Sequence, residues 1–358
     1  MFKQTRAKRF FGFLFIVIFL GHRNAWAASG TEGASFLNIP VGARPAALGS
    51  SYSALASDAY APTWNPGGLG FVDSTQLAGQ HLSYLESIYY EYASFVHPLG
   101  QGRSLGASIQ YLGSGDIAGT DLSGNPTGNY SSHYGAYSVA YGQKLGRKFS
   151  IGLAGKIINA KISDVGATAY AFDLGSMYKL SDRLALAGVL TNVGTRLTFI
   201  DQADSLPLAF HLGVAYDFNH NLNFTAEGVY NQTGLTSFRT GLEWKPLELM
   251  ALRVGYRTDT LAGLSPLAGL SLGLGLQAWG QEFSYAWVPM GDLGSTQYFS
   301  LVMKFGGVPA TKRNLIKYHV NSAHRSEEGV TSWESTESDQ QLMELLSDEP
   351  HIAQKNPQ

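Results

Sequence analysis

The chain has 358 residues, no cysteine and a formal net charge of −2, and only 15% of its residues are charged. Without cysteine there is no disulfide framework and no thiolate chemistry. The near-neutral charge excludes a broadly basic surface for binding nucleic acid. Soluble domains usually carry about 25% charged residues. The low charge, together with 42 glycines, 19 tyrosines and 19 phenylalanines, therefore favours a protein whose outer surface does not face water.

The N-terminus has the three parts of a secretory signal peptide. Four basic residues within positions 3–9 precede an apolar stretch over residues 10–20, and Ala25-Trp26-Ala27 forms a small-x-small cleavage site. The apolar stretch is too short to cross a bilayer as a stable helix. We therefore expect residues 1–27 to be a signal peptide that is removed on export, and the mature chain to start near Ala28.

Between residues 74 and 305 the apolar residues recur with a period close to two, as in β-strands. A soluble β-sandwich also alternates, but its strands are usually about five or six residues long. Strands of about ten residues suit a tilted bilayer crossing. About fourteen segments fit, at 75–85, 88–98, 103–113, 133–145, 148–162, 168–180, 183–193, 207–218, 222–232, 236–245, 250–258, 267–279, 281–289 and 297–305.

The connections between these segments alternate in length. The longer ones span 113–132, 194–206, 258–266 and 289–296, and short turns lie between them. Outer-membrane barrels have short periplasmic turns and longer extracellular loops. The sequence therefore predicts an all-β fold, an antiparallel transmembrane β-barrel of about fourteen strands over residues 74–305. Its outer wall would contact outer-membrane lipid, and an even strand count would return both ends to the periplasm.

Ahead of the strands lies a compact, turn-rich segment with three recognisable parts. It contains Gly42-Ala43-Arg44, a small-residue stretch over residues 46–58 that ends in Asp58, and Asn65-Pro66-Gly67-Gly68-Leu69. The proline fixes a turn, and the paired glycines allow backbone conformations that are closed to residues with a Cβ atom. The small residues would allow a helix to pack closely against a wall.

This signature resembles the N-terminal region of PorV/PorQ-like outer-membrane proteins, which are relatives of the FadL-like long-chain fatty-acid transporter barrels. The resemblance implies that residues 28–73 fold inside the barrel as a hatch. The alternative is a periplasmic N-terminal linker. The chain departs from the fatty-acid transporters at Gly67, where those proteins more often have alanine.

Six charged residues fall on the inward face of three consecutive predicted strands: Glu227, Arg239, Glu243, Lys245, Arg253 and Arg257. A charge on the lipid side would cost about 2–4 kcal/mol at the midplane, so we expect these side chains to face the lumen. They can pair with one another and with the hatch, through Arg44 or Asp58. They can instead line a route for a solute or ion.

The third predicted strand ends in Gly113 and Gly115. In fatty-acid transporters the third strand bends inward and opens a lateral gap through which an apolar ligand leaves into the membrane. The resemblance implies such a bend at these glycines, which the backbone would permit. The alternative is that they only begin the long loop.

The sequence contains no nucleophile elbow, phosphate loop or metal-binding histidine pair at a workable spacing. Asp116, Asp121 and Asn125 lie in the second long loop, but their spacing matches no known calcium loop. We expect no enzyme activity, no cofactor and no metal.

Residues 306–358 form a charge-rich tail with few apolar residues, which we expect to be disordered and periplasmic. Phe305 takes the place of the terminal aromatic residue that the barrel assembly machinery recognises.

Three functions follow from this interpretation. The first is a hatch-gated channel for small hydrophobic compounds, with such a molecule bound in the lumen. The alternative is a non-transporting accessory of a type IX-like protein secretion system. The third is a structural or receptor barrel with a periplasmic partner. An apolar lumen favours the first function, and a polar, plugged lumen with ordered outer loops favours the second.

Overall fold

A computed structural model describes residues 32–84, 87–233, 236–259 and 266–306. The predicted signal peptide and, apart from Gly306, the predicted tail lie outside these ranges. Among the described residues, no helix combines the length and the apolarity needed to cross a membrane.

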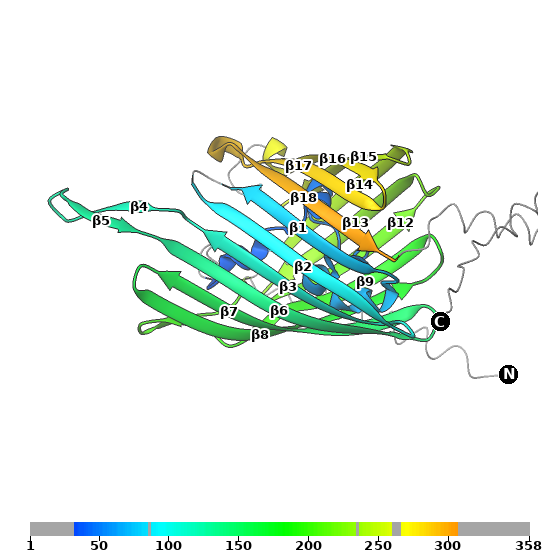
Figure 1. The fold of residues 1–358 in the computed structure, drawn as a ribbon, viewed down its shortest axis with the longest axis horizontal. Coiled ribbons are helices and arrows are strands. Elements are labelled where there is room, and N and C mark those ends of the chain that lie inside the picture. The colour runs from blue at the N-terminus through cyan, green and yellow to red at the C-terminus, as the bar shows by residue number, and fades with distance from the viewer. Residues whose placement is uncertain (1–31, 85–86, 234–235, 260–265, 307–358) are drawn as a thin grey trace, which may run out of the picture. The chain divides into compact units, whose positions relative to one another are not determined.

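Fourteen antiparallel strands form a closed barrel (Figure 1). Every strand pairs with its neighbours in the chain, and β1 closes the barrel against β18, from Thr75 opposite Phe305 to Ser83 opposite Gln297. The predicted fold class and strand count are confirmed, and the strand bounds differ from the predicted ones by only a few residues. The strands are β1 (Thr75–Ser83), β2 (Tyr89–Gly100), β3 (Arg103–Gly113), β6 (Ser132–Leu145), β7 (Phe149–Ile162), β8 (Val165–Lys179), β9 (Leu184–Gly194), β12 (Ala209–Asp217), β13 (Leu222–Asn231), β14 (Thr236–Leu247), β15 (Met250–Arg257), β16 (Leu270–Ala278), β17 (Gln281–Pro289) and β18 (Ser295–Phe305).

The two ends of the barrel differ in their connections. At the short-turn end, where β1 starts and β18 ends, successive strands are joined by a few residues each. The long-loop end carries the hairpins β4 (Ile117–Thr120) with β5 (Pro126–Tyr130) and β10 (Leu197–Phe199) with β11 (Gln202–Asp204), and the short helices η3 (Pro266–Gly269) and η4 (Gly291–Leu293). The β4–β5 hairpin projects beyond the rim (Figure 1). Sequence analysis placed both hairpins in loops and did not predict their strands.

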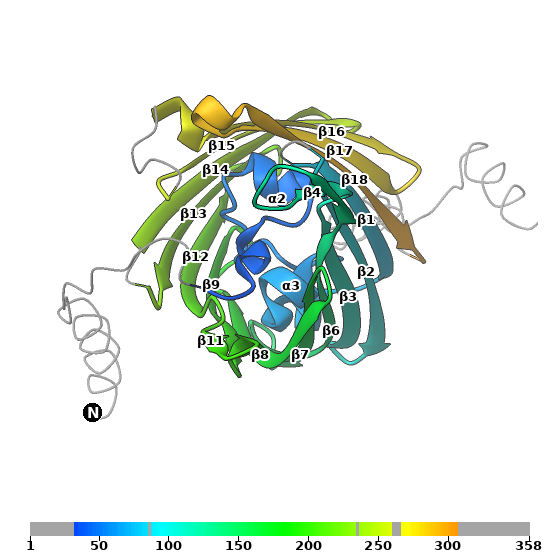
Figure 2. The same cartoon turned by 90° about the vertical axis from the view of Figure 1, so that its left-hand side faces the viewer.

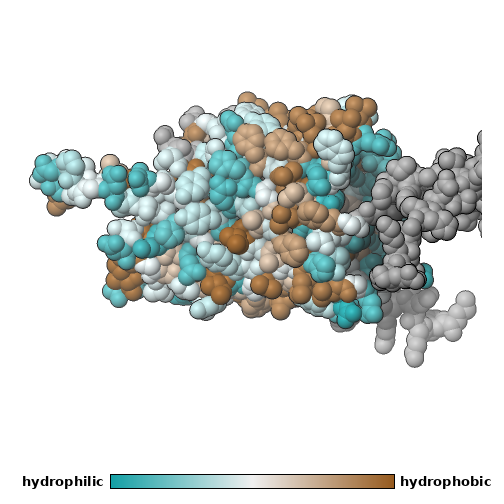
Figure 3. Space-filling model, in the orientation of Figure 1, coloured by the Kyte–Doolittle hydropathy of each residue, from teal (hydrophilic) through white to brown (hydrophobic). Residues whose placement is uncertain are grey.

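Alternation along the strands separates the two faces of the wall. Outward side chains include Val139, Leu174 and Phe238, which are 65%, 51% and 55% exposed. Apolar residues are spread over the outer surface in Figure 3. The inward positions hold small and polar residues together with buried aliphatic and aromatic ones such as Leu82, Tyr90 and Ile158. This arrangement suits a wall that faces lipid outside, because lipid cannot hydrogen-bond to polar groups.

The N-terminal residues fill the interior of the barrel. We call residues 32–73 the inner segment. It contains η1 (Ser35–Asn38), α2 (Ala43–Ala47), α3 (Ala61–Trp64) and η2 (Pro66–Phe71), and Figure 2 shows it inside the ring of strands. It starts at the long-loop end, where the Gly33 amide donates to the Ser205 carbonyl at 2.9 Å. It ends at the short-turn end, where it continues into β1.

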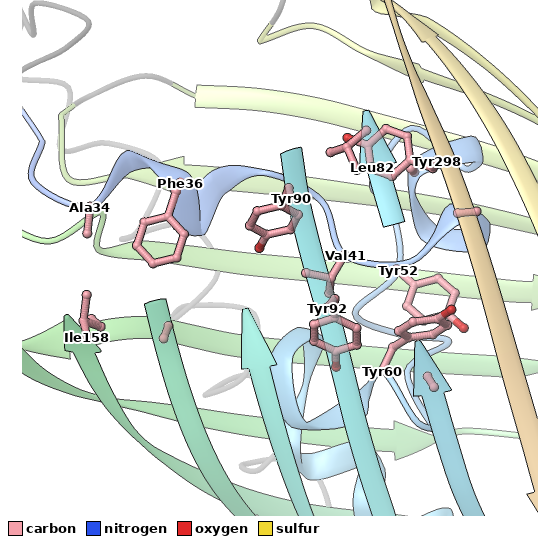
Figure 4. Packing of buried hydrophobic residues seen from close by; sticks show 14 of the residues in the cluster. Ala34, Phe36, Val41, Tyr52, Tyr60, Leu82, Tyr90, Tyr92, Ile158 and Tyr298 are labelled. Atoms are coloured by element: carbon pink, nitrogen blue, oxygen red, sulfur yellow. The ribbon is translucent and has the colours of Figure 1, made fainter. Parts of the chain in front are cut away.

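The buried core joins the inner segment to the wall. Phe36, Tyr52 and Tyr60 of the segment belong to one cluster with wall residues such as Tyr90 and Ile158 (Figure 4). The ring centroids of Phe36 and Tyr134 are 5.6 Å apart. The hydrophobic effect therefore stabilises the segment in the lumen as well as the barrel around it.

Candidate functional site: the barrel interior

The inner segment touches the wall closely on β6, β7 and β8. Gly142, Gly152 and Gly175 lie directly opposite one another on these strands and all face inward. A Cβ atom added to Gly152 would stand 2.1 Å from the Pro66 carbonyl oxygen, and one on Gly142 would stand 2.5 Å from the same atom. The Ser150 hydroxyl also donates to the Gly67 carbonyl at 2.6 Å. We call this region the β6–β8 contact.

Asn65 connects the turn of the inner segment to the wall. Its Oδ1 accepts from the Gly67 amide at 2.9 Å and caps η2. Its Nδ2 donates to the Ser53 carbonyl at 2.9 Å and to the Ser176 carbonyl of β8 at 3.1 Å. The predicted turn at Asn65-Pro66 is therefore present, and one side chain satisfies groups on both the segment and the wall.

The predicted reason for the two glycines of this turn was wrong. Neither Gly67 nor Gly68 is among the residues with positive φ. A Cβ atom on Gly68 would instead stand 1.6 Å from the Ala56 carbonyl oxygen, and one on Gly67 would stand 2.8 Å from the Gly175 carbonyl oxygen. These positions require glycine because two backbones approach closely there.

A second close approach lies across the lumen, on β14, β15 and β16. Gly241 lies opposite Gly255, and Gly255 lies opposite Ser271. A Cβ atom on Gly255 would stand 1.9 Å from the Gly49 amide nitrogen. That amide donates to the Ser271 hydroxyl at 3.1 Å. We call this region, with the charged residues beside it, the β14–β17 contact.

The charged part of the β14–β17 contact is a chain of alternating charges. Arg44 donates to both carboxylate oxygens of Glu243, at 2.8 and 2.9 Å. Arg253 donates to Glu243 at 2.7 Å and to Glu282 at 2.5 Å. Glu243 is fully buried and Arg253 is 3% exposed. Since a buried ion requires a partner, each of these groups stabilises the others.

Other residues of the predicted signature lie beside this chain. The Gly42 amide, whose residue has a φ of 89°, donates to the Gln80 Oε1. The Ala43 amide donates to the Ser300 hydroxyl at 3.2 Å. Asp58 accepts from the Tyr52 hydroxyl and lies 3.6 Å from Arg44. Burial raises the pKa of Asp58 above its ordinary value, and the charge of Arg44 opposes that rise.

The other inward charges are paired as well. Glu227 is 1% exposed and accepts from the Ser53 amide at 2.9 Å, while its second oxygen lies 2.8 Å from the His211 Nδ1. Asp259 pairs with Arg257 at 2.5 Å and with Arg239 at 3.0 Å. Lys245 lies 3.6 Å from Glu243.

The structure adds one inward ion pair that sequence analysis missed. Lys156 on β7 and Asp173 on β8 are 2.7 Å apart and buried. Asn192, which has a φ of 61°, accepts from Lys156 at 2.8 Å and donates its amide to Asp173 at 2.7 Å. Alternation along the two strands places both charges inward, and this signal could have identified them as lumen-facing residues, although not as partners.

The third strand is paired along its whole length. Gly113 lies opposite Tyr89 on one side and His133 on the other, and Gly115 follows the strand with a φ of 65°. The pairing of β3 with β2 has one irregularity, between Pro98 and Gly100 at the short-turn end, and none near Gly113. A bend at these glycines that opens a lateral gap stays a prediction.

Two of the loop residues with side-chain oxygens, Asp121 and Asn125, form a turn. Asp121 Oδ1 accepts from the amides of Ser123 and Asn125, each at 2.8 Å. Hydrogen bonds from Asn125 lower the pKa of this exposed carboxyl. Among the described residues, no group of three or more histidine, aspartate or glutamate side chains could hold a metal ion.

A cavity separates η1 and the following residues from the wall. Counting the part open to solvent, it measures about 620 Å³. The inner segment contributes the apolar residues Leu37, Ile39, Val41 and Trp64 to its lining. The wall contributes Val229 and the polar residues Gln110, Lys156, Thr191, Asn192, His211, Asn231 and Arg239.

The lining of the lumen differs between the two sides of the long-loop half. On β1, β2, β3, β6, β7, β8 and β18, the inward residues there include the apolar or aromatic Leu82, Tyr90, Leu112, Tyr134, Ile158, Ala169 and Tyr298. On β9, β12, β13, β14 and β15, they include the polar or charged Thr191, Asn192, His211, Glu227, Arg239 and Arg257. In the half nearer the short-turn end, polar residues are frequent, among them Gln76, Ser94, Ser104, Ser150, Glu243 and Arg253. The β6–β8 contact lies nearer the short-turn end than the apolar residues of the same strands.

Comparison with protein families gives one match. The family model described as type IX secretion system protein PorV matches residues 23–229, which is more than half of the chain. No curated protein matches the sequence significantly.

Solved structures of similar shape include two hydrocarbon channels. One is described as the CymD monoaromatic hydrocarbon channel, with 13% identity, a TM-score of 0.54, and coverage of 75% of this chain and 98% of that one. Another is the P. putida toluene transporter TodX, with 14% identity, a TM-score of 0.51, and coverage of 75% and 99%. At these identities the likeness concerns the fold.

Proposed function

This chain belongs to the PorV family, and we propose that it is a hatch-gated outer-membrane barrel for the passage of small hydrophobic compounds. The observation that carries this proposal is the lining of the lumen. Apolar and aromatic residues of the neighbouring strands β18, β1, β2, β3 and β6 line one side of the lumen at the long-loop end, and a cavity lies beside η1 in the same half. The inner segment closes the path beyond them. The hydrocarbon channels CymD and TodX share the fold.

The orientation is part of the proposal. The long-loop end faces the outside, and the short-turn end faces the periplasm, as short turns do in outer-membrane barrels. An apolar solute then leaves water for the aromatic lining, which the hydrophobic effect favours. It reaches the cavity beside η1, whose lining combines apolar residues of the inner segment with polar residues of the wall.

Passage beyond the cavity requires the inner segment to move. The segment acts as the hatch, and the β6–β8 and β14–β17 contacts hold it closed. The inward charges Glu227, Arg239, Glu243, Lys245, Arg253 and Arg257 serve this closure by pairing with the segment or with one another. We assign them no catalytic role.

An uptake experiment tests the proposal. Intact cells with an outer membrane poorly permeable to apolar solutes would be given radiolabelled toluene, with and without the protein. We expect several-fold faster accumulation with the protein. Val139→Ala, on the lipid face, is the control variant and should not change the rate. Equal rates with and without the protein would rule out transport of this compound class.

A second candidate function is a non-transporting accessory role in type IX protein secretion, with a periplasmic or cell-surface protein partner. Two observations favour it. One is the family match, and the other is the attachment of the inner segment to the wall through buried ion pairs. The test is secretion of a type IX cargo by a strain that lacks its own PorV-like protein. Restored cargo release together with unchanged toluene uptake would favour this role over transport.

A further inference from the structure

The residues that line the cavity beside η1 indicate which kind of ligand it can bind. Three positively charged or protonatable side chains line it, and each already faces a carboxylate. Lys156 lies 2.7 Å from Asp173, His211 lies 2.8 Å from Glu227, and Arg239 lies 3.0 Å from Asp259. A carboxylate ligand would have to compete with one of these carboxylates in a buried site, where an unpaired charge is costly. The lining is therefore suited to a neutral molecule.

Two polar side chains of the lining have a buried atom without a hydrogen-bond partner among the described residues: the Nε of Arg239, whose Nη2 pairs with Asp259, and the Oε1 of Gln110. Gln110 of β3 is 4% exposed and lines the cavity. Its Nε2 makes only a long contact of 3.5 Å with the Thr63 hydroxyl, and its Oε1 has no hydrogen-bond partner among the described residues. Buried polar groups are almost always paired, so an exception requires an explanation.

One end of the Gln110 side-chain amide lacks a hydrogen-bond partner in either orientation. If the oxygen and nitrogen exchange places, the oxygen can accept from Thr63, and the NH₂ group then lacks a partner. A hydroxyl group both donates and accepts hydrogen bonds. It would therefore satisfy Gln110 in either orientation, whereas a pure hydrocarbon would satisfy it in neither.

The inner segment contributes apolar residues to the cavity lining, including one aromatic ring. The Trp64 Nε1 donates to the Val41 carbonyl at 2.9 Å, so the polar atom of the indole is already used. Leu37, Ile39 and Val41 of the segment also line the cavity. These residues suit the body of a small apolar or aromatic molecule, which would pack against the indole.

We propose that this cavity binds a small neutral amphiphile, an aromatic or aliphatic body with one hydroxyl group, and that Gln110 determines the preference for the hydroxyl. The inference rests on the proposed function and narrows its substrate class. It separates this barrel from one that binds fatty acids through their carboxylate and from one that binds plain hydrocarbons.

Three probes of matched size test the proposal: 4-ethylphenol, ethylbenzene and 4-ethylbenzoate. The full mature protein is reconstituted in lipid nanodiscs, and binding to empty nanodiscs is subtracted, because apolar probes partition into lipid. Isothermal titration calorimetry gives each Kd. We expect 4-ethylphenol to bind roughly tenfold more tightly than ethylbenzene, as one added hydrogen bond allows, and 4-ethylbenzoate to bind most weakly.

Gln110→Leu should remove the preference by weakening 4-ethylphenol roughly tenfold while leaving ethylbenzene unchanged. Gln143→Leu, at the short-turn end and outside the cavity lining, is the matched control and should keep the wild-type order. The probe series on the unmodified protein decides the question even if Gln110→Leu fails to assemble.

The possible results distinguish failure of this inference from failure of the proposed function. Equal binding of 4-ethylphenol and ethylbenzene would overturn the inference and leave the proposed function in place. Tightest binding of 4-ethylbenzoate would overturn the inference in favour of an anionic ligand. Absence of binding by all three would contradict the inference and remove support for the proposed function as well.

Discussion

The inner segment is held on two sides of the barrel by different physical means. At the β6–β8 contact, the backbone of η2 lies against Gly142, Gly152 and Gly175. Two charged groups lie against η2 there, the ammonium groups of Lys144 and Lys179, but they lie over the Phe71 ring, 4.8 and 4.3 Å from its centroid, and not at the glycines. At the β14–β17 contact, a similar close approach at Gly255 is joined by the buried chain Arg44–Glu243–Arg253–Glu282.

This difference predicts which substitutions weaken each contact. Packing against glycine is sensitive to one added methyl group and insensitive to salt, because it involves no charge. A buried charge network tolerates small shifts, but it becomes costly when one member is removed, since the remaining charges stay buried without a partner. Removal of one charged group should therefore weaken the β14–β17 contact strongly, whereas the β6–β8 contact should be weakened by an added methyl group.

Removing both attachments at once should have the largest effect. Deletion of residues 36–69, with the signal peptide kept, should leave a barrel that still assembles, because the wall's hydrogen bonds close among its own strands. The variant should conduct ions far better than the intact protein in planar bilayers, since a fourteen-strand lumen is wider than the eight-strand size that side chains can fill. Single-channel conductance measures this, and unchanged conductance of an assembled variant would mean that the segment does not block the lumen.

The charged side alone is tested by Glu243→Ala. This change leaves Arg44 and Arg253 without their shared partner, and we expect it to lower the free energy of unfolding by about 3–5 kcal/mol. Urea unfolding of the reconstituted protein measures the loss. Glu248→Ala, at an exposed carboxylate in the turn after β14, should change stability by less than about 0.5 kcal/mol. Similar values for the two variants would remove the distinction between the contacts.

The glycine side is tested by two alanine substitutions on one strand. Gly152→Ala places a Cβ atom against the Pro66 carbonyl, whereas Gly155→Ala adds one on the outer face, where nothing lies within 4 Å. Overpacking of this kind costs about 1–3 kcal/mol. Gly152→Ala should make the inner segment accessible to limited proteolysis at a salt-independent rate, and Gly155→Ala should leave it protected. Equal protection in both variants would show that η2 is not held by this contact.

The barrel itself was predictable from the sequence because the lipid-facing wall imposes a strict period of two. Leu242 and Glu243 are adjacent, and alternation alone places the first outside and the second inside, as the structure has them. The pairing of Glu243 with Arg44 was one of two interpretations that the sequence left open, since periodicity gives a side chain's face but not its partner.

The glycine contacts could not be predicted in the same way. Gly152 and Gly155 look alike in the sequence, and they differ only because one of them meets the inner segment. Which wall glycines are needed depends on where the segment lies, and this is a long-range property. For the same reason, the role of Gly67 and Gly68 was assigned to unusual dihedral angles when it lies in close approach.

The smallest expected loss of stability comes from substitution of Asn65, which belongs to the β6–β8 contact. These variants test whether the Asn65 side chain attaches η2 to the wall or only caps it. If the residue acts only as a helix cap, Asn65→Asp should be tolerated, because aspartate caps as well as asparagine does. In the structure, however, Nδ2 donates to the carbonyls of Ser53 and Ser176. A carboxylate would turn those two hydrogen bonds into contacts between acceptors inside a site where Asn65 is fully buried. Asn65→Ala removes the same bonds without that repulsion and should cost about 1–2 kcal/mol. We therefore expect Asn65→Asp to lower the unfolding free energy more than Asn65→Ala does, and both variants to shift the proteolysis of the inner segment in that order. The reverse order would make Asn65 a local cap alone, and the β6–β8 contact would then depend on glycine packing without a hydrogen bond from this side chain to the wall.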